Sequence, residues 1–326
     1  MKKILAVAAT VVLVCVTVCL FLFSDREYSA VYTGLGTVIS VKIKSQKGKK
    51  VNKELSELFT LLEDTLDAND SSSVLSAFNE TDETDNEIIA DLTNRCIPLT
   101  ADTNGAFDFS LGALTRLWHI GFSDEKVPDE NEIADALKNK GAEKIICENG
   151  TVKKPESVKL DFGGAAKGYA CDRAAEILKK ENAKSAVISV GGSLLFWGKN
   201  GLKECWTAAV RDPFDSNKYA GTFNIKGGFV STSGSYERYF DFENERYHHI
   251  LDPETGFPAK SDLVSVTVIA QNGTVSDALS TACFILGEEK SKAVLEKYSA
   301  KAIFIYGDKS VSADIDFVCD GEYFLR

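Results

Sequence analysis

The glycine-rich stretch around which this 326-residue sequence is organised reads Asp161-Phe162-Gly163-Gly164-Ala165-Ala166-Lys167-Gly168-Tyr169-Ala170-Cys171-Asp172. It follows an extended run, residues 157–160, and opens an apolar-periodic helix expected over residues 169–178. Backbone approaches a ligand closely at glycine because no Cβ stands in the way. A helix N-terminus adds free N–H groups and a partial positive charge. The stretch is therefore a candidate phosphate-binding turn, and a tight strand-to-helix connection without a ligand is the alternative.

Two well-known phosphate-binding patterns do not fit this stretch. A Walker A loop has Lys directly after its last Gly, whereas Lys167 precedes Gly168 here. The dinucleotide fingerprint needs Gly-x-Gly, which is absent. Other parts of the sequence must therefore indicate whether the turn holds a ligand.

The order of the predicted elements indicates the fold class. Apolar periodicity predicts helices at residues 50–67, 85–100, 128–138, 169–178, 275–286 and 288–298. Strands are expected at residues 30–44 (with a kink at Gly34-Leu35-Gly36), 185–190, 193–197, 206–210, 222–225, 228–232, 263–270 and 302–306, a hairpin at 145–153 and a loop at 68–80. Because no strict βαβ rhythm is present, we expect an α+β fold with mixed sheets and flanking helices.

The N-terminus predicts a membrane segment. Lys2 and Lys3 precede an uncharged apolar run, residues 4–23, which is twenty residues long and sufficient to cross a bilayer as one transmembrane helix. No convincing cleavage site follows, and Cys15 and Cys19 each follow Val rather than a small residue. We expect residues 1–24 to be a cell-membrane anchor, with one domain, residues 30–326, outside the cytoplasm. Cleavage or lipidation of this segment is the alternative.

Composition excludes some other classes of site. The net charge of −11, with no basic cluster, argues against a nucleic-acid-binding surface. Six cysteines follow the apolar run, and none has the spacing of a metal site. We expect buried free thiols, although an even number also permits disulfides.

A second candidate for chemistry is the start of the helix expected at residues 275–286. Asp277 and Thr281 lie one turn apart and therefore on the same face. A carboxylate and a hydroxyl so placed can bind a hard cation such as Mg²⁺, which prefers oxygen ligands. The alternative is a capped helix whose Asp277 complements the helix dipole.

A third candidate is the pair His248-His249, which precedes Ile250-Leu251-Asp252-Pro253-Glu254-Thr255-Gly256. In a strand the two side chains point to opposite faces, so we expect at most one to serve a site. A histidine there can act as a general base near neutral pH, and a structural role is the alternative. Ala106-Phe107-Asp108, an acid beside an aromatic residue, and Thr232-Ser233-Gly234 are further polar turns. A serine hydrolase is a poor match, because no G-x-S-x-G elbow occurs.

The order of these segments matches one known family. The sequence resembles the ApbE-like family of FAD:protein FMN transferases over residues 32–307. Nine landmarks carry the resemblance: Gly36-Thr37, the Ser73-x-x-Ser76-x-x-Asn79 loop, Gly105-Ala106-Phe107-Asp108 with Leu117-Trp118, the glycine-rich stretch, Gly191-Gly192, Arg211-Asp212-Pro213, Thr232-Ser233-Gly234, His249 to Gly256, and Asp277-Ala278-Leu279-Ser280-Thr281.

The resemblance implies an ApbE-like fold and a two-walled site for FAD. The glycine-rich stretch and the Asp277 helix would meet at the FAD pyrophosphate, with Mg²⁺ between them. The resemblance assigns these residues as follows: Asp277, Thr281 and the carbonyl of Gly164 as metal ligands, with Ser280 as a further candidate; Asp161, Lys167, Ala106, Phe107, Asp108 and the backbone near Leu251 as the FAD lining; and His249 as the catalytic base.

The implied activity is a Mg²⁺-dependent FAD:protein FMN transferase. It would attach FMN through a phosphoester bond to a Thr or Ser of an extracytoplasmic flavoprotein and release AMP. The chain lacks a convincing acceptor sequence of its own, so the target is expected in another protein. An FAD pyrophosphatase that yields FMN and AMP, and a non-catalytic flavin-binding protein, are the alternatives.

Three positions depart from the family pattern. Leu35 stands where the family often has Met, and Ser193 follows Gly191-Gly192 where Asn or Asp is common. Asn69 aligns with a Tyr that packs on the ligand in many members. A small polar residue there resembles the subgroup associated with FAD hydrolysis, which keeps the pyrophosphatase alternative open.

Overall fold

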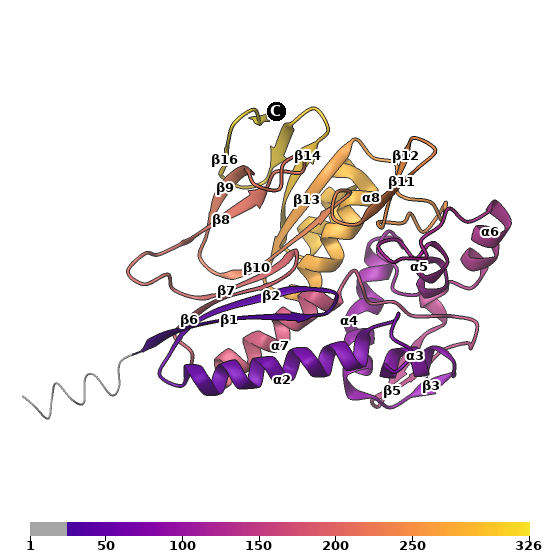
Figure 1. Ribbon diagram of the computed structural model, residues 1–326, viewed down its shortest axis with the longest axis horizontal. Helices are drawn as coiled ribbons and strands as arrows, with labels where there is room; N and C mark the ends of the chain where they lie inside the picture. Colours follow the sequence, from indigo (N-terminus) through magenta and orange to yellow (C-terminus); the bar gives the residue numbers. More distant parts are fainter. Residues whose placement is uncertain (1–24) are drawn as a thin grey trace, which may run out of the picture.

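The computed structural model describes residues 25–326, which form an α+β fold in three layers (Figure 1). A nine-stranded sheet is the middle layer. Helices cover one of its faces, and a three-stranded sheet covers part of the other face. The α+β prediction is confirmed.

The nine strands of the main sheet are antiparallel except for the last pair. In spatial order they are β1 (Arg26–Gly34), β2 (Thr37–Ser45), β6 (Ser185–Val190), β7 (Ser193–Gly198), β10 (Gly228–Gly234), β13 (Leu263–Ala270), β14 (Lys301–Tyr306), β15 (Ser310–Ala313) and β17 (Phe324–Leu325).

The smaller sheets and the helices complete the domain. The smaller sheets contain β16 (Phe317–Cys319), β9 (Tyr219–Ile225) and β8 (Trp206–Arg211); β3 (Glu83–Thr84), β5 (Thr151–Lys153) and β4 (Ile146–Glu148); and β11 (Tyr239–Phe242) with β12 (Glu245–His248). The helices are α2 (Gly48–Leu66), α3 (Val74–Asn79), α4 (Glu87–Asp102), α5 (Gly112–Trp118), α6 (Glu130–Lys138), α7 (Ala166–Lys180), α8 (Gly273–Lys297) and the 3-10 turn η1 (Ala142–Lys144).

Two predicted elements differ in the structure. The kinked strand at residues 30–44 is wrong: Leu35 and Gly36 both have positive φ, 54° and 66°, so the chain reverses and β1 pairs with β2 as a hairpin. The loop expected at residues 68–80 contains α3, whose N-terminus is capped by the Ser73 side chain accepting from the Ser76 N–H. The hairpin at residues 145–153 is confirmed.

The long helix α8 is two helices in sequence, as predicted. Gly287 has φ 76° and ψ 169° and therefore interrupts the helical backbone. The N-terminal half, which carries Asp277, packs against β10, β13 and α7. Its start is held by the buried carboxylate of Asp172, which accepts hydrogen bonds from the Gly273 and Thr274 N–H groups and from the Thr274 hydroxyl, at 2.6–2.9 Å. The last residue of the glycine-rich stretch thus fixes the start of the second wall.

Helices α7 and α8 meet at two glycines. A Cβ built on Gly168 would lie 2.0 Å from the carbonyl oxygen of Gly273, and one built on Gly273 would lie 2.2 Å from that of Gly168. Both contacts are with backbone, which cannot move aside as a flexible side chain does. The close approach places the first turn of α7 directly beside Asp277, whose Oδ2 accepts from the Gly168 N–H at 2.9 Å.

We therefore expect Gly168→Ala to destabilise the protein. Overpacking against rigid backbone should lower the free energy of unfolding by about 2–3 kcal/mol. Urea unfolding followed by circular dichroism measures the change. Gly307→Ala is the matched control, because a Cβ there meets nothing closer than 3.8 Å. Equal stability of the two variants would contradict the helix contact described here.

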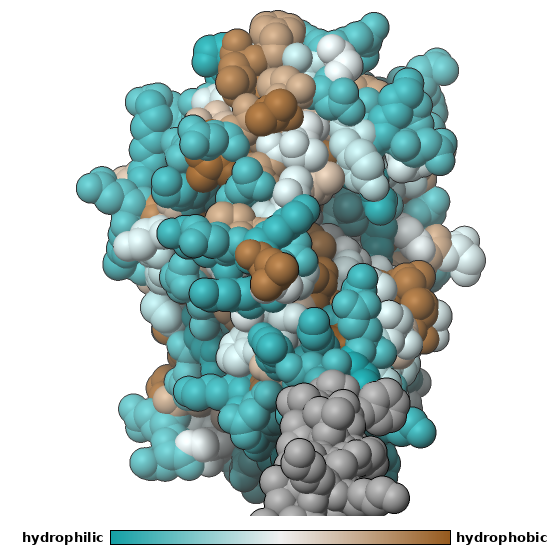
Figure 2. Space-filling view, turned by 90° about the vertical axis from the view of Figure 1, so that its left-hand side faces the viewer, coloured by the Kyte–Doolittle hydropathy of each residue, from teal (hydrophilic) through white to brown (hydrophobic). Residues whose placement is uncertain are grey.

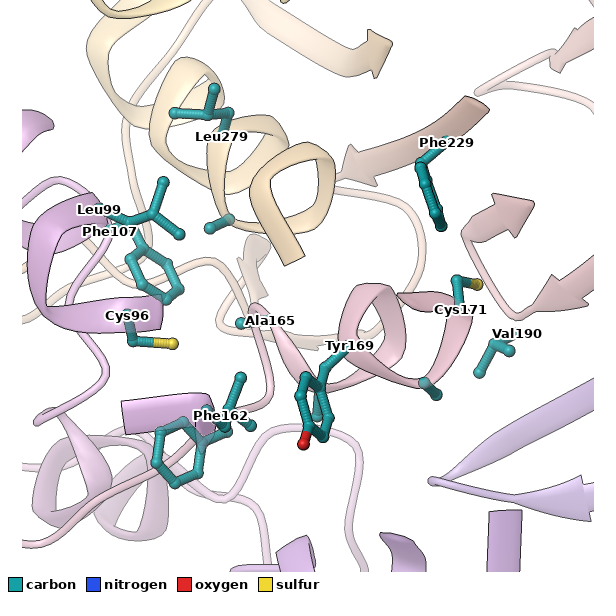
Figure 3. Close-up of a cluster of buried hydrophobic side chains, with 14 of the residues drawn as sticks. Cys96, Leu99, Phe107, Phe162, Ala165, Tyr169, Cys171, Val190, Phe229 and Leu279 are labelled. Atoms are coloured by element: carbon teal, nitrogen blue, oxygen red, sulfur yellow. The ribbon is translucent and has the colours of Figure 1, made fainter. Parts of the chain in front are cut away.

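Figure 3 shows how the glycine-rich stretch is attached to the core. Phe162, Ala165 and Tyr169 are buried in the same hydrophobic cluster as Phe107 and Leu279. The rings of Phe162 and Phe109 also stack with centroids 5.6 Å apart. Because these side chains point inward, the glycines and Lys167 between them are left on the opposite side of the turn.

In the part of the chain that the structure describes, none of the helices has the length and apolar composition of a membrane span. The predicted anchor, residues 1–24, lies outside the described residues and stays a prediction, as does the division into anchor and domain. The six cysteines of the described part are free; Cys96, Cys171 and Cys283 are buried, as expected, whereas Cys147, Cys205 and Cys319 are partly exposed.

Candidate functional site

A cleft opens beside the end of β10, where Thr232, Ser233 and Gly234 line it. Its walls come from the glycine-rich stretch with α7, the first half of α8, the end of β10, the segment before α5 and the segment after β12. Ten of the eleven predicted site residues line it: Ala106, Phe107, Asp108, Asp161, Gly164, Lys167, His249, Leu251, Asp277 and Thr281. Segments up to 175 residues apart in the sequence thus converge on one cleft.

Asp161, the first residue of the glycine-rich stretch, is held by two hydrogen bonds. Asp161 accepts from the Gly163 N–H at 2.7 Å through Oδ1 and from the Thr115 hydroxyl at 2.7 Å through Oδ2. Lys167 lies in the first turn of α7. Its Nζ donates to the Gly163 carbonyl at 3.0 Å and lies 3.9 Å from Asp277 Oδ2. The turn therefore presents an ammonium group directly beside the carboxylate of the opposite wall.

Asp277 is the central acid of the second wall. Its side chain is 4% exposed, and besides the Gly168 N–H it accepts from the Ser193 hydroxyl at 3.0 Å through Oδ1. These two donors fix the carboxylate plane, because one bond reaches each oxygen. Each oxygen keeps a further lone pair for a ligand in the cleft.

The structure separates the two hydroxyl candidates on α8. Thr281 lines the cleft, with its Oγ1 3.5 Å from the position that a Cβ on Gly164 would take. Ser280 is fully buried and does not line it; its hydroxyl lies 2.7 Å from that of Ser233 and donates to the Asp277 carbonyl at 2.8 Å. Ser280 is therefore left out of the proposed ligand set, because it does not line the cleft, whereas Thr281 lines it although its hydroxyl also lies 3.2 Å from that of Ser233.

The charge of the cleft favours a cation. Four carboxylates line it, Asp108, Asp161, Glu237 and Asp277, against the single ammonium of Lys167. A pyrophosphate placed among them would be repelled unless a cation neutralised the charge. Within residues 25–326 no group of three His, Cys, Asp or Glu side chains could hold a metal ion. The oxygen set of Asp277, Thr281 and the Gly164 carbonyl is nevertheless the kind that Mg²⁺ takes, since it completes its shell with water and phosphate.

His249 faces the cleft in a defined tautomer. Its Nδ1 lies 3.2 Å from the backbone carbonyl of Arg238, which can only accept, so Nδ1 carries the proton and Nε2 keeps a lone pair. The ring edge is open to the cleft, but protein atoms crowd the rest of it. This desolvation, followed by the positive charge of Lys167, lowers the pKa of His249 to about 3. The imidazole is therefore neutral and able to accept a proton throughout the physiological pH range.

His248 has a structural role, as expected for the neighbour that points the other way. Its Nε2 donates to the Ala259 carbonyl at 3.1 Å, and its Nδ1 accepts from the Ile250 N–H at 3.3 Å. The ring packs edge-on against Phe284, and burial lowers its pKa. Only one histidine of the pair thus serves the cleft.

The segment that carries His249 and Leu251 is fixed from outside the cleft. The Trp118 indole N–H donates to the Gly256 carbonyl at 2.8 Å, and Lys140 Nζ donates to the Pro253 carbonyl at 2.6 Å. Both donors come from the α5–α6 region. The position of the histidine therefore depends on two residues that do not line the cleft.

Sequence inspection missed several lining residues. Thr115 orients Asp161, and Glu237 adds a fourth acid to the cleft. Neither belongs to a recognisable local motif, so only the tertiary structure brings them in. Asn69 lies in a hollow that adjoins the cleft and shares Thr115, Asp161, His249 and Leu251 with it.

Known proteins of one family are similar to this chain over most of its length. The model of the ApbE family matches residues 35–304. The FAD:protein FMN transferase of Treponema pallidum is 36% identical over 320 residues, covering 90% of this chain and 88% of that protein. The Escherichia coli K12 protein of the same name is 32% identical, covering 75% of each. The crystal structure of the ApbE protein from Thermotoga maritima superposes with a TM-score of 0.81 at 33% identity, covering 88% of this chain and 97% of that one.

Proposed function

The chain belongs to the ApbE family, and from this premise we propose that it is a Mg²⁺-dependent FAD:protein FMN transferase. The observation that carries the proposal is the cleft itself. Three groups face the cleft: the hydrogen-bonded carboxylate of Asp277, the ammonium of Lys167 beside the glycine-rich turn, and the neutral imidazole of His249 with a free Nε2. These are the parts that transfer of a phosphoryl-type group requires: charge neutralisation, positioning and a proton acceptor.

In the proposed reaction, a Thr or Ser hydroxyl of the acceptor protein enters the cleft beside His249. Nε2 accepts the hydroxyl proton while the oxygen attacks the phosphorus that bears FMN. The bond from that phosphorus to the bridging oxygen breaks, and the bridging oxygen leaves with AMP. Lys167 and the first turn of α7 hold the pyrophosphate oxygens during the exchange.

The metal would be held by Asp277, Thr281 and the carbonyl of Gly164. Bound there, Mg²⁺ supplies positive charge to the pyrophosphate and to the departing phosphate. The residues of the chain set its position: Ser193 and the Gly168 N–H orient the Asp277 carboxylate, and the Phe107 ring, 3.3 Å from the position that a Cβ on Gly164 would take, limits movement of the turn. The aromatic and apolar lining by Phe107, Ala106 and Leu251 would contact the uncharged parts of FAD.

A second activity, hydrolysis of FAD to FMN and AMP, is supported by Asn69. The hollow that it lines adjoins His249, so water can reach the base where a large aromatic residue would fill the space. We expect Asn69→Tyr to slow AMP release in the absence of acceptor several-fold, while transfer to an acceptor is retained. Chromatography of AMP and FMN, with and without acceptor, measures both rates. Hydrolysis that Asn69→Tyr leaves unchanged would argue against this second activity.

We also propose that residues 1–24 anchor the protein in the cell membrane, with the domain and its acceptor outside the cytoplasm. The twenty-residue apolar run after Lys2 and Lys3 supports this placement. Mass spectrometry of the mature N-terminus tests whether the segment is retained.

A further inference from the structure

The strand register defines two opposite ends of the main sheet. At one end Arg26 pairs with Ser45, Lys44 with Ser185, and Ser185 with Gly198. At the other end Gly34 pairs with Thr37, and Val190 with Ser193. The cleft lies at this second end, because β10 continues past Ser231, the partner of Ser193, to Gly234, which lines the cleft. The first end, where β1 begins and the β7–β8 loop projects, is on the left in Figure 1.

The predicted anchor leaves almost no free chain before this first end. The apolar run ends at residue 23, and Asp25 is already held by an ion pair with Lys184 at 3.3 Å. Two residues span at most about 7 Å when fully extended. With residues 4–23 in a bilayer, the first end of the sheet has to lie against the lipid headgroups rather than stand away from them.

The surface at this end has the chemistry for that contact. Three lysines are exposed there: Lys42, Lys199 and Lys203. A hollow at this end is lined by Lys42 and Lys44 together with residues 200 and 201 of the β7–β8 loop. Leu202, at the tip of that loop, is fully exposed at 106%. Figure 2 views the molecule from this side and shows a largely hydrophilic surface with separate apolar patches.

The whole chain carries a net charge of −11, so a surplus of lysines at this end of the sheet is a local feature. The end carries five lysines and three acids: Lys42, Lys44, Lys184, Lys199 and Lys203 against Asp25, Glu27 and Glu204. Lysines on a surface are attracted to anionic headgroups, and a leucine at a loop tip inserts into the boundary of the acyl chains. The Trp206 indole, at the base of the loop, donates to the Gly198 carbonyl and holds the loop against the sheet.

We propose that this end of the sheet, formed by the β7–β8 loop and the start of β1, docks on an anionic lipid bilayer, with Leu202 inserted and Lys199 and Lys203 at the headgroups. The proposal uses the predicted anchor and goes beyond the proposed transferase activity, since none of these residues lines the cleft. Docking of this end sets the orientation of the whole domain relative to the bilayer. The nine-residue strands β1 and β2 place the cleft about 30 Å from the bilayer and at the opposite end. An acceptor hydroxyl then has to be presented at that height above the lipid.

Quenching by brominated lipid tests the docking in the full chain. The full-length protein with Leu202→Trp is reconstituted into vesicles of phosphatidylglycerol and phosphatidylcholine, with and without bromine on the acyl chains. Phe242→Trp is the matched control, because Phe242 is 48% exposed on the β11–β12 hairpin, which follows the cleft end of β10. The unsubstituted protein gives the background from Trp118, Trp197 and Trp206.

We expect bromine to reduce the added fluorescence of Leu202→Trp about twofold and to leave that of Phe242→Trp unchanged. Adding Lys199→Glu and Lys203→Glu to Leu202→Trp should weaken the quenching, whereas adding Lys138→Glu and Lys290→Glu, two exposed lysines elsewhere, should not. Equal quenching at positions 202 and 242, an equal effect of both lysine pairs, or failure of the full chain to associate with the vesicles would each overturn the proposal.

Discussion

Replacing Asp277 with alanine is expected to reduce turnover of FAD about a thousand-fold, a loss comparable to removal of a main electrostatic contact with the transition state. The carboxylate is the buried acid that joins the two walls, with one oxygen toward Ser193 and the other toward the first turn of α7. Its loss removes the proposed metal ligand and leaves the Gly168 N–H without its acceptor. Some FAD binding should remain, because the other walls of the cleft are intact. AMP release measures turnover, and flavin fluorescence titration measures binding.

Two neighbouring hydroxyls provide the control for Asp277. Thr281→Val removes the hydroxyl that lines the cleft, whereas Ser280→Ala removes one that is buried in packing. We expect Thr281→Val to raise the Mg²⁺ concentration needed for half-maximal activity and Ser280→Ala to leave it unchanged. Thermal unfolding of each variant checks that the fold is retained. Full activity of Asp277→Ala, or a stronger metal effect from Ser280→Ala, would contradict the assignment.

Replacing His249 with alanine is expected to reduce FMN transfer about 10²- to 10⁴-fold, the range for loss of a general base. Affinity for FAD should change little, because the ring is assigned to the acceptor hydroxyl rather than to the nucleotide. His249→Gln, which keeps a polar side chain of similar length without a basic nitrogen, should be as inactive. A non-catalytic flavin-binding protein would show no turnover in the unsubstituted chain and no response to either substitution.

The expected pH dependence of activity follows from the lowered pKa of His249. The pKa of His249 is lowered from its ordinary value, to about 3, so the free enzyme keeps the ring neutral as pH falls from 8 to 5. We therefore expect no acid limb near pH 6.5 in kcat/KM, which reports the free enzyme. Because the charge of Lys167 is one cause of the lowering, an anionic pyrophosphate beside it should raise this pKa in the complex. The acid limb of kcat should then lie above that of kcat/KM.

The parts of the fold that sequence predicted are those with strong local patterns. Apolar periodicity located α2 and α7, and Gly287 marked the break within α8. The hairpin between β1 and β2 was missed because Leu35 adopts a positive φ that a leucine rarely takes. Helix α3 was missed because its flanking Ser, Asn and Asp residues are typical of loops, although Ser73 acts as its cap.

The sequence predicted the charged residues that line the cleft through the family pattern, but not the residues that orient them. The family pattern brought Asp277, Lys167 and His249 to one cleft, as the structure shows. The same pattern included Ser280, because sequence cannot tell which of two adjacent hydroxyls points inward. Thr115 and Glu237 enter the cleft through tertiary packing alone, and no spacing in the sequence indicates them.

The reaction that we propose for this cleft is transfer of FMN from FAD to a hydroxyl of another protein. The most direct measurement is the intact mass of an acceptor flavoprotein domain after incubation with the full chain, FAD and Mg²⁺. We expect a gain of one FMN unit less water, equimolar release of AMP, and loss of both with Asp277→Ala and His249→Ala. An unchanged acceptor mass with FAD left intact would contradict it.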